Sequence, residues 1–346
     1  MLSVEEPLLI NEPAVKSGDF AALRPVLEGY RNPSFSKSLS QCLTSIPPFF
    51  ALWALMWLAL PYSYVLTLIL AVPASGFMLR MFMIQHDCGH GTFFKSRAAN
   101  NCLGFCLGIL TFTPYYYWRR SHSLHHASSG NLDRRGHGDI HTLTVKEYLA
   151  LSPSRRFAYR IFRHPVFLFG LAPVLHFVIG QRLIYAEART WTKERINVHI
   201  TSLLIVLFFG GLSFVVGLRA LLLIQLPLMA ISASAGVWLF FVQHQFHETY
   251  WQRQERWNYS AAGGEGSSYY ALPRVLQWFT ANIGFHHIHH LDSRIPNYRL
   301  EECFKEHPCM QNVKVLTLRE SFSCASLALW DEESQTLVGF DHPGLG

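Results

Sequence analysis

Four apolar stretches, arranged as two closely spaced pairs, limit what this chain can fold into. The first pair is Thr44 to Leu60 and Ser63 to Ile84, separated by a Pro-Tyr turn. The second pair is His199 to Gly217 and Ala220 to Val242, with only two residues between them. Each stretch is close to the roughly 20 residues that a helix needs to cross a bilayer. The pattern predicts an all-α integral membrane protein with two transmembrane helical hairpins, four spans in total.

The composition agrees with this expectation. Half of the 346 residues are hydrophobic, only 15% are charged, and the mean hydropathy is positive, whereas ordinary soluble domains carry more charge. The seven cysteines are an odd number without a CxxC pair, which is typical of reduced thiols and not of a disulfide framework.

Two further apolar stretches are poorer candidates for spans. Asn101 to Trp118 and Ile161 to Gly180 are each broken by proline and carry aromatic or basic residues inside or at the edge. Such segments are typical of the membrane interface. We therefore expect both to be interfacial or re-entrant.

The basic residues predict how the hairpins are oriented. The turns inside the hairpins hold only Arg219, whereas fifteen Lys and Arg residues lie between Gln85 and Asn197 and eight follow Val242. By the positive-inside tendency, both termini and the large middle loop are cytoplasmic and form a cap there. No basic stripe interleaved with aromatic residues stands apart from the membrane segments, so we expect no nucleic-acid partner. The net charge of +6 fits contact with anionic lipid headgroups.

Histidines on that side are grouped in four short sequences, "HDCGH", "HSLHH", "QHQFH" and "HHIHH". His86 and His90 are four residues apart, so a helix places both rings on one face. The spacing i, i+3, i+4 recurs in two triplets, which are His122, His125 and His126, and then His286, His289 and His290. Each set can direct its rings to one point, as metal ligands do.

The number of rings predicts two ions. One zinc ion takes three or four protein ligands, and these sets together with a histidine from "QHQFH" supply more than one ion can bind. An all-imidazole site suits iron, copper, nickel or zinc. An oxygen-activating pair would explain the duplication, which favours iron over a redox-inert zinc hydrolase.

Three sequences, "QHDCGHGTFF", "RRSHSLHHASSGNLDRRGHGD" and "NIGFHHIHHLDSRIPNY", occur in this order around the hairpins. Together they resemble the membrane-bound fatty acid desaturase family, and most closely its acyl-lipid delta-12 (omega-6) branch, from about Gly29 to about Asn312. The resemblance implies four spans, a cytosolic helical cap and two iron ions that activate O2. The ligands it implies are His86, His90, His122, His125, His126, His244, His286, His289 and His290.

Other residues near these sequences are candidates for supporting roles. His247 could be a ligand, a partner of a ligand or neither. Carboxylates commonly orient ligand histidines, and those nearby in sequence are Asp87, Asp133, Asp139 and Glu248. Arg134 and Arg135 could bind a lipid phosphate, or they could belong to a solvated basic loop.

The reaction implied by the resemblance is removal of two hydrogens from a lipid-linked acyl chain, with a delta-12 bond in oleoyl groups as the specific expectation. Such a chain needs a narrow apolar tunnel. The aromatic residues near the histidines could line it or form an interfacial belt, and we expect the belt. These residues are Tyr115, Tyr116, Tyr117, Trp118, Trp238 and Phe241. A separate ferredoxin-like or cytochrome b5-like protein would supply electrons, since the chain ends in "DHPGLG" and lacks the HPGG motif of a fused haem domain.

Several alternatives stay open. Related enzymes with the same histidines could hydroxylate, epoxidise or conjugate lipids or act as carotenoid ketolases. From other classes, a histidine-rich metal transporter would place its ligands within the bilayer, and a zinc hydrolase would not need oxygen. We expect three parts, namely an N-terminal cytosolic or interfacial segment (1–43), the membrane desaturase domain (44–312) and a C-terminal cytosolic extension (313–346).

Overall fold

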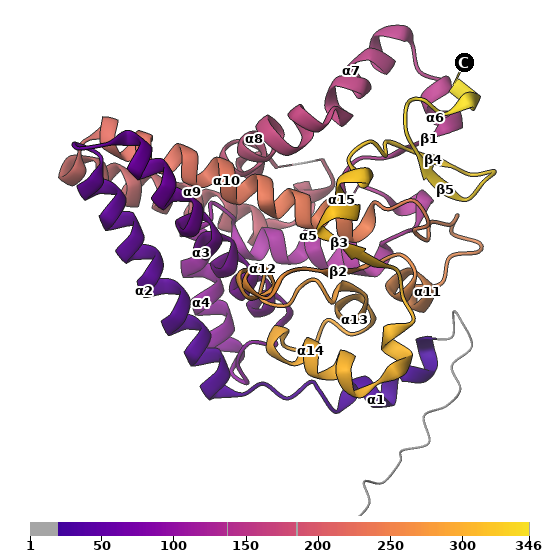
Figure 1. Cartoon of the computed structure of the whole chain (residues 1–346), viewed down its shortest axis with the longest axis horizontal. Coiled ribbons are helices and arrows are strands. Elements are labelled where there is room, and N and C mark those ends of the chain that lie inside the picture. Colours follow the sequence, from indigo (N-terminus) through magenta and orange to yellow (C-terminus); the bar gives the residue numbers. More distant parts are fainter. Residues whose placement is uncertain (1–19, 137, 185, 346) are drawn as a thin grey trace, which may run out of the picture.

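The computed structural model describes residues 20–136, 138–184 and 186–345. Its longest helices pair as two hairpins, α2 (Phe35–Ala59) with α3 (Tyr64–His90) and α9 (Thr192–Val216) with α10 (Leu218–His244). Within these ranges, the same four helices are long and apolar enough to cross a membrane. Figure 1 shows the turns of both hairpins at one end of the molecule and the C-terminal elements at the other. The predicted helical membrane fold with four spans is confirmed.

Short polar residues and glycines define where these helices begin and end. The Ser34 and Ser63 side chains accept hydrogen bonds from backbone N–H groups in the first turns of α2 and α3, as N-caps do. Gly91 ends α3 with a φ of 74°, and Gly217 connects α9 to α10 with a φ of 87°, a region that glycine adopts without strain. All four helices extend beyond the predicted apolar stretches.

The outer faces of the hairpins are apolar. Val65, Leu207 and Phe214 are 67%, 60% and 93% exposed. Apolar surface of this extent is unfavourable in water, whereas lipid tails would cover it. The chain is therefore built as a membrane protein.

Neither of the two weaker apolar stretches forms a straight span. The first is divided between α4 (Arg97–Leu110) and α5 (Tyr115–Ser128). The second runs from α7 (Pro153–Arg163) through a π-helical turn, η3 (Phe167–Leu171), into α8 (Ala172–Val178). The two halves of this second stretch meet at a bend of 57°, as in a broken span or a re-entrant loop. This geometry agrees with the predicted interfacial or re-entrant segment.

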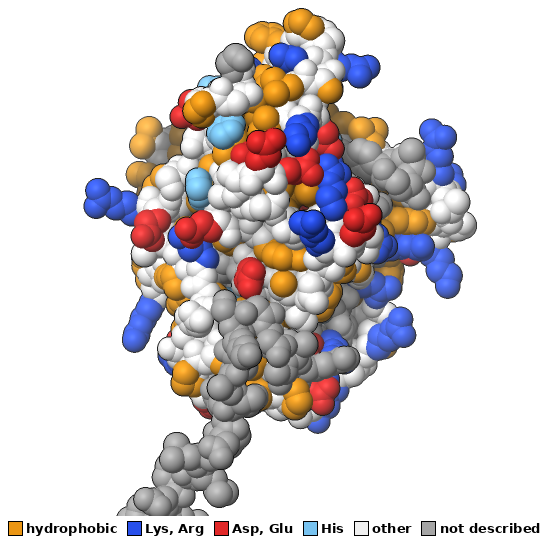
Figure 2. Space-filling view, turned by 90° about the vertical axis from the view of Figure 1, so that its right-hand side faces the viewer, with side chains coloured by type: hydrophobic (Ala, Val, Ile, Leu, Met, Phe, Trp, Pro, Cys, Tyr) orange, Lys and Arg blue, Asp and Glu red, His pale blue; other side chains and the backbone are white. Residues whose placement is uncertain are grey.

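The remaining elements form a cap beside the ends of α3 and α10. Its helices are α1 (Arg24–Glu28), α6 (Val145–Leu149), α11 (Tyr259–Gly264), α12 (Arg274–Phe279), α13 (His286–Leu291), α14 (Asn297–Glu306) and α15 (Leu318–Cys324). Its 3-10 turns are η1 (Phe20–Leu23), η2 (Leu132–Arg134), η4 (Gly180–Arg182), η5 (Ala186–Thr190), η6 (Pro308–Gln311) and η7 (Pro343–Leu345). Viewed from the end opposite the hairpin turns, its surface carries intermixed acidic and basic side chains (Figure 2).

Short strands connect the C-terminal segment to the rest of the cap. Strand β4 (Leu329–Asp331) lies between β1 (Leu143–Thr144), to which it is parallel, and β5 (Thr336–Val338), to which it is antiparallel. Strand β2 (Tyr269–Ala271) pairs in parallel with β3 (Val315–Thr317). Residues 313–346 thus supply three strands, β3, β4 and β5, besides the helix α15.

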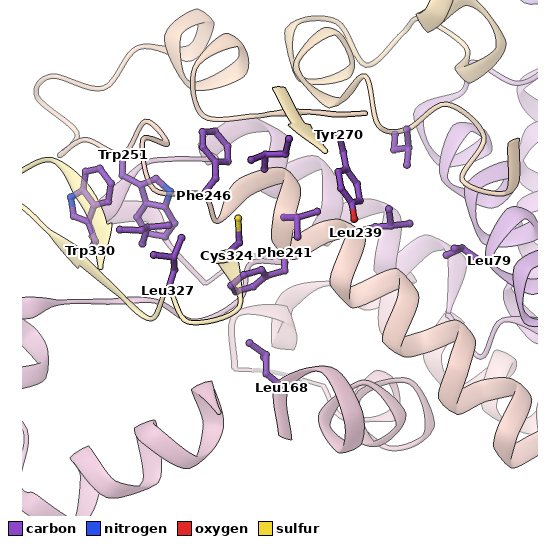
Figure 3. Packing of buried hydrophobic residues seen from close by; sticks show 14 of the residues in the cluster. Leu79, Leu168, Leu239, Phe241, Phe246, Trp251, Tyr270, Cys324, Leu327 and Trp330 are labelled. Atoms are coloured by element: carbon purple, nitrogen blue, oxygen red, sulfur yellow. The ribbon is translucent and has the colours of Figure 1, made fainter. Parts of the chain in front are cut away.

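A hydrophobic core joins the cap to α10. Figure 3 shows Phe241 and Leu239 of α10 beside Tyr270 and Cys324 of the cap. The Trp238 Nε1–H donates a hydrogen bond to the Tyr270 hydroxyl at 3.2 Å, and that hydroxyl also bonds Ser321 Oγ at 2.9 Å. These contacts fix the C-terminal end of α10, where His244 lies, relative to the cap.

Candidate metal centre

Four helices bring histidines to one place between the hairpins and the cap. His86 and His90 occupy the last two turns of α3, and α5 contributes the triplet that begins at His122. His244 is the last residue of α10. The short helix α13 begins at His286 and contains the whole "HHIHH" sequence. The predicted helical spacing is therefore present in α3, α5 and α13.

The rings form two neighbouring groups. In each group the candidate ligand atoms lie within 4.8 Å of one another. The larger group is His86, His90, His122, His126 and His289, and the smaller is His125, His244 and His290. The Nε2 of His286 lies 2.9 Å from that of His244, which places it beside the smaller group. All nine histidines predicted as ligands are thus brought together.

Hydrogen bonds at the far side of three rings orient them. His125 Nδ1–H donates to Asp139 Oδ1 at 2.5 Å, and His244 Nδ1–H donates to the Gly266 carbonyl at 3.2 Å. His86 Nδ1 lies 3.2 Å from Asp87 Oδ1. A neutral imidazole with its proton on Nδ1 has a lone pair on Nε2, which is the atom that a metal binds.

The facing lone pairs indicate a cation. The Nδ1 atoms of His125 and His244 face hydrogen-bond acceptors on the far side of each ring, and their Nε2 atoms lie 3.2 Å apart, a distance at which one metal ion can bind both. Nitrogens that bind one ion at about 2.1 Å through perpendicular bonds lie roughly 3 Å apart. The buried His90 Nε2 and His290 Nε2 have no hydrogen-bond partner in the described structure. A shared metal ion satisfies such atoms, and an all-imidazole donor set suits iron or another first-row transition metal.

The environment favours the neutral form of five of these rings. Burial, and then repulsion from neighbouring rings, lowers the imidazole pKa well below its usual value in the site histidines of α5 and α13 that follow. They are His122, His126, His286, His289 and His290. Removal from water disfavours the charged imidazolium. Neutral rings have the lone pairs that a metal ion requires.

Only some of the supporting residues suggested by the sequence lie at this centre. Asp87 is buried and also accepts two hydrogen bonds of 2.8 Å from Asn297, one from its backbone N–H and one from its side chain. Asp133 instead binds Arg253 on the cap surface at 2.7 Å. Glu248 is exposed and pairs with Lys314, and His247 is exposed as well. These three side chains do not join the histidines.

The two arginines considered for a headgroup differ in their surroundings. Arg135 makes a two-bond ion pair with Glu147 and also donates to the Leu132 and Thr142 carbonyls. Its guanidinium is therefore committed to the protein. Arg134 is exposed.

Some residues at the site could not be identified from the sequence. His287 lies in α13 but donates to the Met310 carbonyl at 3.0 Å, away from the other rings. Its position off the i, i+3, i+4 pattern is the sequence signal that distinguishes it from the ligand candidates. No sequence pattern marks Gly266 or Asn297 as part of the site. Gly266 acts through its backbone carbonyl, which accepts from His244, and Asn297 acts through Asp87, which is far away in the chain.

A largely apolar cavity of about 570 Å³ reaches the histidines. His86, His122 and His286 lie on its wall at one end, and Met78 and Met229 are among the residues that line it. Tyr117 and Trp118 also line it, whereas Tyr115 and Phe241 are fully buried in the core. The predicted interfacial belt is thus wrong for these aromatic residues, because α5 and the end of α10 face inward.

The fold and the site define a class, that of polytopic helical membrane proteins with a polyhistidine metal centre at the ends of their spans. A family model described as "Fatty acid desaturase" matches residues 57–311. A Bacillus subtilis (strain 168) protein named "Fatty acid desaturase" is 46% identical over 311 residues, which are 90% of this chain and 88% of that protein. The chain belongs to the fatty acid desaturase family, and it is an oxygen-dependent oxidoreductase.

More distant relatives carry more specific names. The "sn-1 acyl-lipid omega-3 desaturase (ferredoxin)" of Synechocystis sp. is 28% identical over 229 residues, covering 64% of this chain and 61% of that protein. The "sn-1 oleoyl-lipid 12-desaturase" of Anabaena variabilis is 23% identical over 264 residues, covering 70% and 67%.

Proposed function

We propose that the nine clustered histidines hold two iron ions, one in each group of rings. The facing Nε2 atoms of His125 and His244 carry this proposal, because they lie 3.2 Å apart with each Nδ1 turned to an acceptor, an arrangement in which one ion can bind both rings. Iron in these positions would supply the redox chemistry that activates dioxygen. Asp139, Asp87 and the Gly266 carbonyl hold the rings by accepting from Nδ1.

The reaction removes two hydrogens from adjacent methylene carbons and forms one C=C bond. Reduction of O2 to two water molecules takes four electrons and four protons, of which the acyl chain supplies two of each. An external donor supplies the other two electrons, and two protons come from water. The protein holds the chain beside the histidines and excludes bulk water from the cavity.

The shape of the cavity supports an acyl chain as the substrate. Its α10 wall runs from Gln243 beside the histidines to Met229, which is about 21 Å of helix at 1.5 Å per residue. Beyond Met229 the helices α3 and α10 touch, since Ser75 Oγ donates to the Leu228 carbonyl at 3.1 Å. We propose that the acyl chain lies along this wall with its methyl end directed toward Met78 and Met229.

The polar end of the substrate would lie at the opposite mouth. Gly136, Gly138, Asp139 and His141 line the cavity there. A lipid headgroup fits this position, with exposed Arg134 as the basic residue nearby in sequence. The Synechocystis and Anabaena relatives are named for acyl-lipid and oleoyl-lipid substrates, which supports a lipid-linked substrate.

As the specific reaction we propose a delta-12 (omega-6) bond that converts oleoyl to linoleoyl groups. The three histidine sequences and the 12-desaturase relative support carbon 12, while other relatives are named for omega-3 bonds. We further propose that the termini and histidines face the cytoplasm, and that residues 44–312 form the catalytic domain between an N-terminal segment (1–43) and a C-terminal extension (313–346).

A fatty-acid profile tests this function. The chain would be expressed in a host that makes oleate but no dienes, beside a His289→Ala control, and double bonds would be located by gas chromatography and mass spectrometry. We expect an 18:2 product with its second bond at carbon 12 that the control lacks. A bond elsewhere would overturn the regiochemistry, and a hydroxylated or epoxidised lipid would overturn the reaction.

A further inference from the structure

Helix α5 separates two cavities of opposite character. Its residues Tyr117, Trp118, Ser121 and His122 line the apolar cavity described above. A second cavity, of about 520 Å³, is lined by Tyr116, Arg119, Arg120 and Ser123. These positions follow the spacing i, i+3, i+4, i+7, so they occupy the other face of the helix. The helix that carries His122, His125 and His126 is therefore a wall between an apolar and a polar compartment.

The second cavity is basic. Lys95, Arg97, Arg119 and Arg120 line it together with one carboxylate, Glu194. Glu194 pairs with Arg120 at 3.2 Å, and Arg119 donates to the Asn101 side chain at 2.9 Å. Lys95 and Arg97 are exposed, and no side-chain hydrogen bond or ion pair to them occurs within the described residues. The cavity therefore has a net positive charge that the protein itself leaves unbalanced.

The floor of this cavity is part of the metal centre. His90 lines the second cavity, and His122 lines the apolar one. In the larger group of rings these two are partly exposed, while His86, His126 and His289 are buried. The two cavities thus reach the same group of rings from different sides, the basic one at His90 and the apolar one at His86 and His122.

We propose that the basic cavity over His90 is the docking site of an acidic, one-electron donor protein. The inference rests on the proposed desaturase function, because that reaction needs two electrons beyond those from the acyl chain. Two successive one-electron transfers would oxidise two reduced donor molecules and reduce the centre by two electrons. The substrate fills the apolar cavity, so the donor needs a second approach.

Charge complementarity selects the partner. A protein surface rich in Asp and Glu is attracted to Lys95 and Arg97, and such attraction chiefly raises the rate of association. The attraction weakens as salt screens it. A lipid headgroup could also bind basic residues, but the acyl chain of that lipid would need an apolar wall, and this cavity is lined mainly by polar and charged groups.

The test is a double charge reversal, Lys95→Glu with Arg97→Glu, in the full-length protein in membranes. Desaturation would be followed at several concentrations of a reduced plant-type ferredoxin and at several ionic strengths. We expect the KM for ferredoxin to rise on the order of tenfold at low salt, and this difference to shrink at high salt. The control is Arg319→Glu, which reverses an exposed charge on α15 and should leave that KM unchanged.

A second measurement separates docking from folding and from the reaction itself. Protein reduced chemically with dithionite and then exposed to O2 needs no donor, so the double variant should form as much product in a single turnover as the wild type. An unchanged KM, or an equal change in Arg319→Glu, would overturn the docking site. A lost single turnover in the double variant alone would also overturn it, whereas a wild type that fails would overturn the desaturase function instead. Weakened binding of the membrane protein to anionic phospholipid vesicles, with an unchanged ferredoxin KM, would assign the cavity to a lipid.

Discussion

At the scale of single residues, the orientation of each imidazole matters as much as its position. The Nδ1 atoms of His125 and His244 point to fixed acceptors, and this orientation turns their Nε2 atoms toward one another. A substitution that removes the Asp139 carboxylate would free the His125 ring to rotate. The acceptors are therefore part of the metal site although they do not touch the ion.

Replacement of the two histidines of "QHQFH" should have very different effects on iron content and activity. His244→Ala removes a ring that contacts both His125 and His286, so we expect loss of bound iron and of activity. His247→Ala changes an exposed side chain and should leave iron content and activity near the wild-type values. Iron per chain, measured by mass spectrometry on purified protein, checks both. Equal losses in the two variants would contradict the site.

Two aspartates give a second matched pair. Asp139→Asn weakens the acceptor that orients His125, and loss of such a partner typically costs 10–100-fold in metal affinity, so we expect a decrease of about this size. Asp133→Asn alters an exposed ion pair with Arg253 and should leave the affinity unchanged. Competition with a chelator would measure both, and a similar decrease in Asp133→Asn would refute the assigned role of Asp139.

These pairs also show what sequence spacing can and cannot predict. All nine predicted ligands come together, because rings three and four residues apart share a helical face. His247 is also three residues from His244, but α10 ends at His244, so the helical rule does not extend to it. In sequence, Asp133 and Asp139 are equally plausible as hydrogen-bond partners of a ligand histidine. Only the path of the loop in the folded chain places Asp139 beside His125 and Asp133 beside Arg253.

At the scale of elements, the four spans were predictable and their ends were not. Hydropathy marks the apolar part of a helix, whereas backbone hydrogen bonding continues α3 to His90 and α10 to His244. These polar last turns are the parts that carry histidines. The sequence therefore locates the spans but underestimates how far they reach into the site.

The α10 wall of the apolar cavity should influence where the double bond forms. Met229→Ala would deepen the closed end of the cavity. Acyl chains long enough to reach that end could insert farther, and their new double bond would lie farther from the methyl end of the chain. Location of the bond by mass spectrometry in 16-, 18- and 20-carbon chains would measure the change. Leu226→Ala, at a 51% exposed position of the same helix, is the control. An unmoved bond in Met229→Ala would show that the depth of the cavity does not set the position.

At the scale of the whole molecule, the hairpins and the cap were predictable as separate parts, but their connections were not. Strands of two or three residues, such as β1 and β4, lack a periodic pattern that sequence could show. Their pairing ties the C-terminal segment to the middle loop. The division of the interior into an apolar and a basic cavity likewise depends on the two faces of α5, which only the folded chain defines.

The central claim is that two irons held by the clustered histidines use oxygen to desaturate an acyl chain. A single-turnover measurement tests it most directly, with anaerobically reduced protein of known iron content, bilayers of oleoyl lipid, and O2 added last. We predict one new double bond for every two irons, and none without O2 or after replacement of iron by zinc. Product formed without oxygen, or by the zinc-loaded protein, would contradict the account.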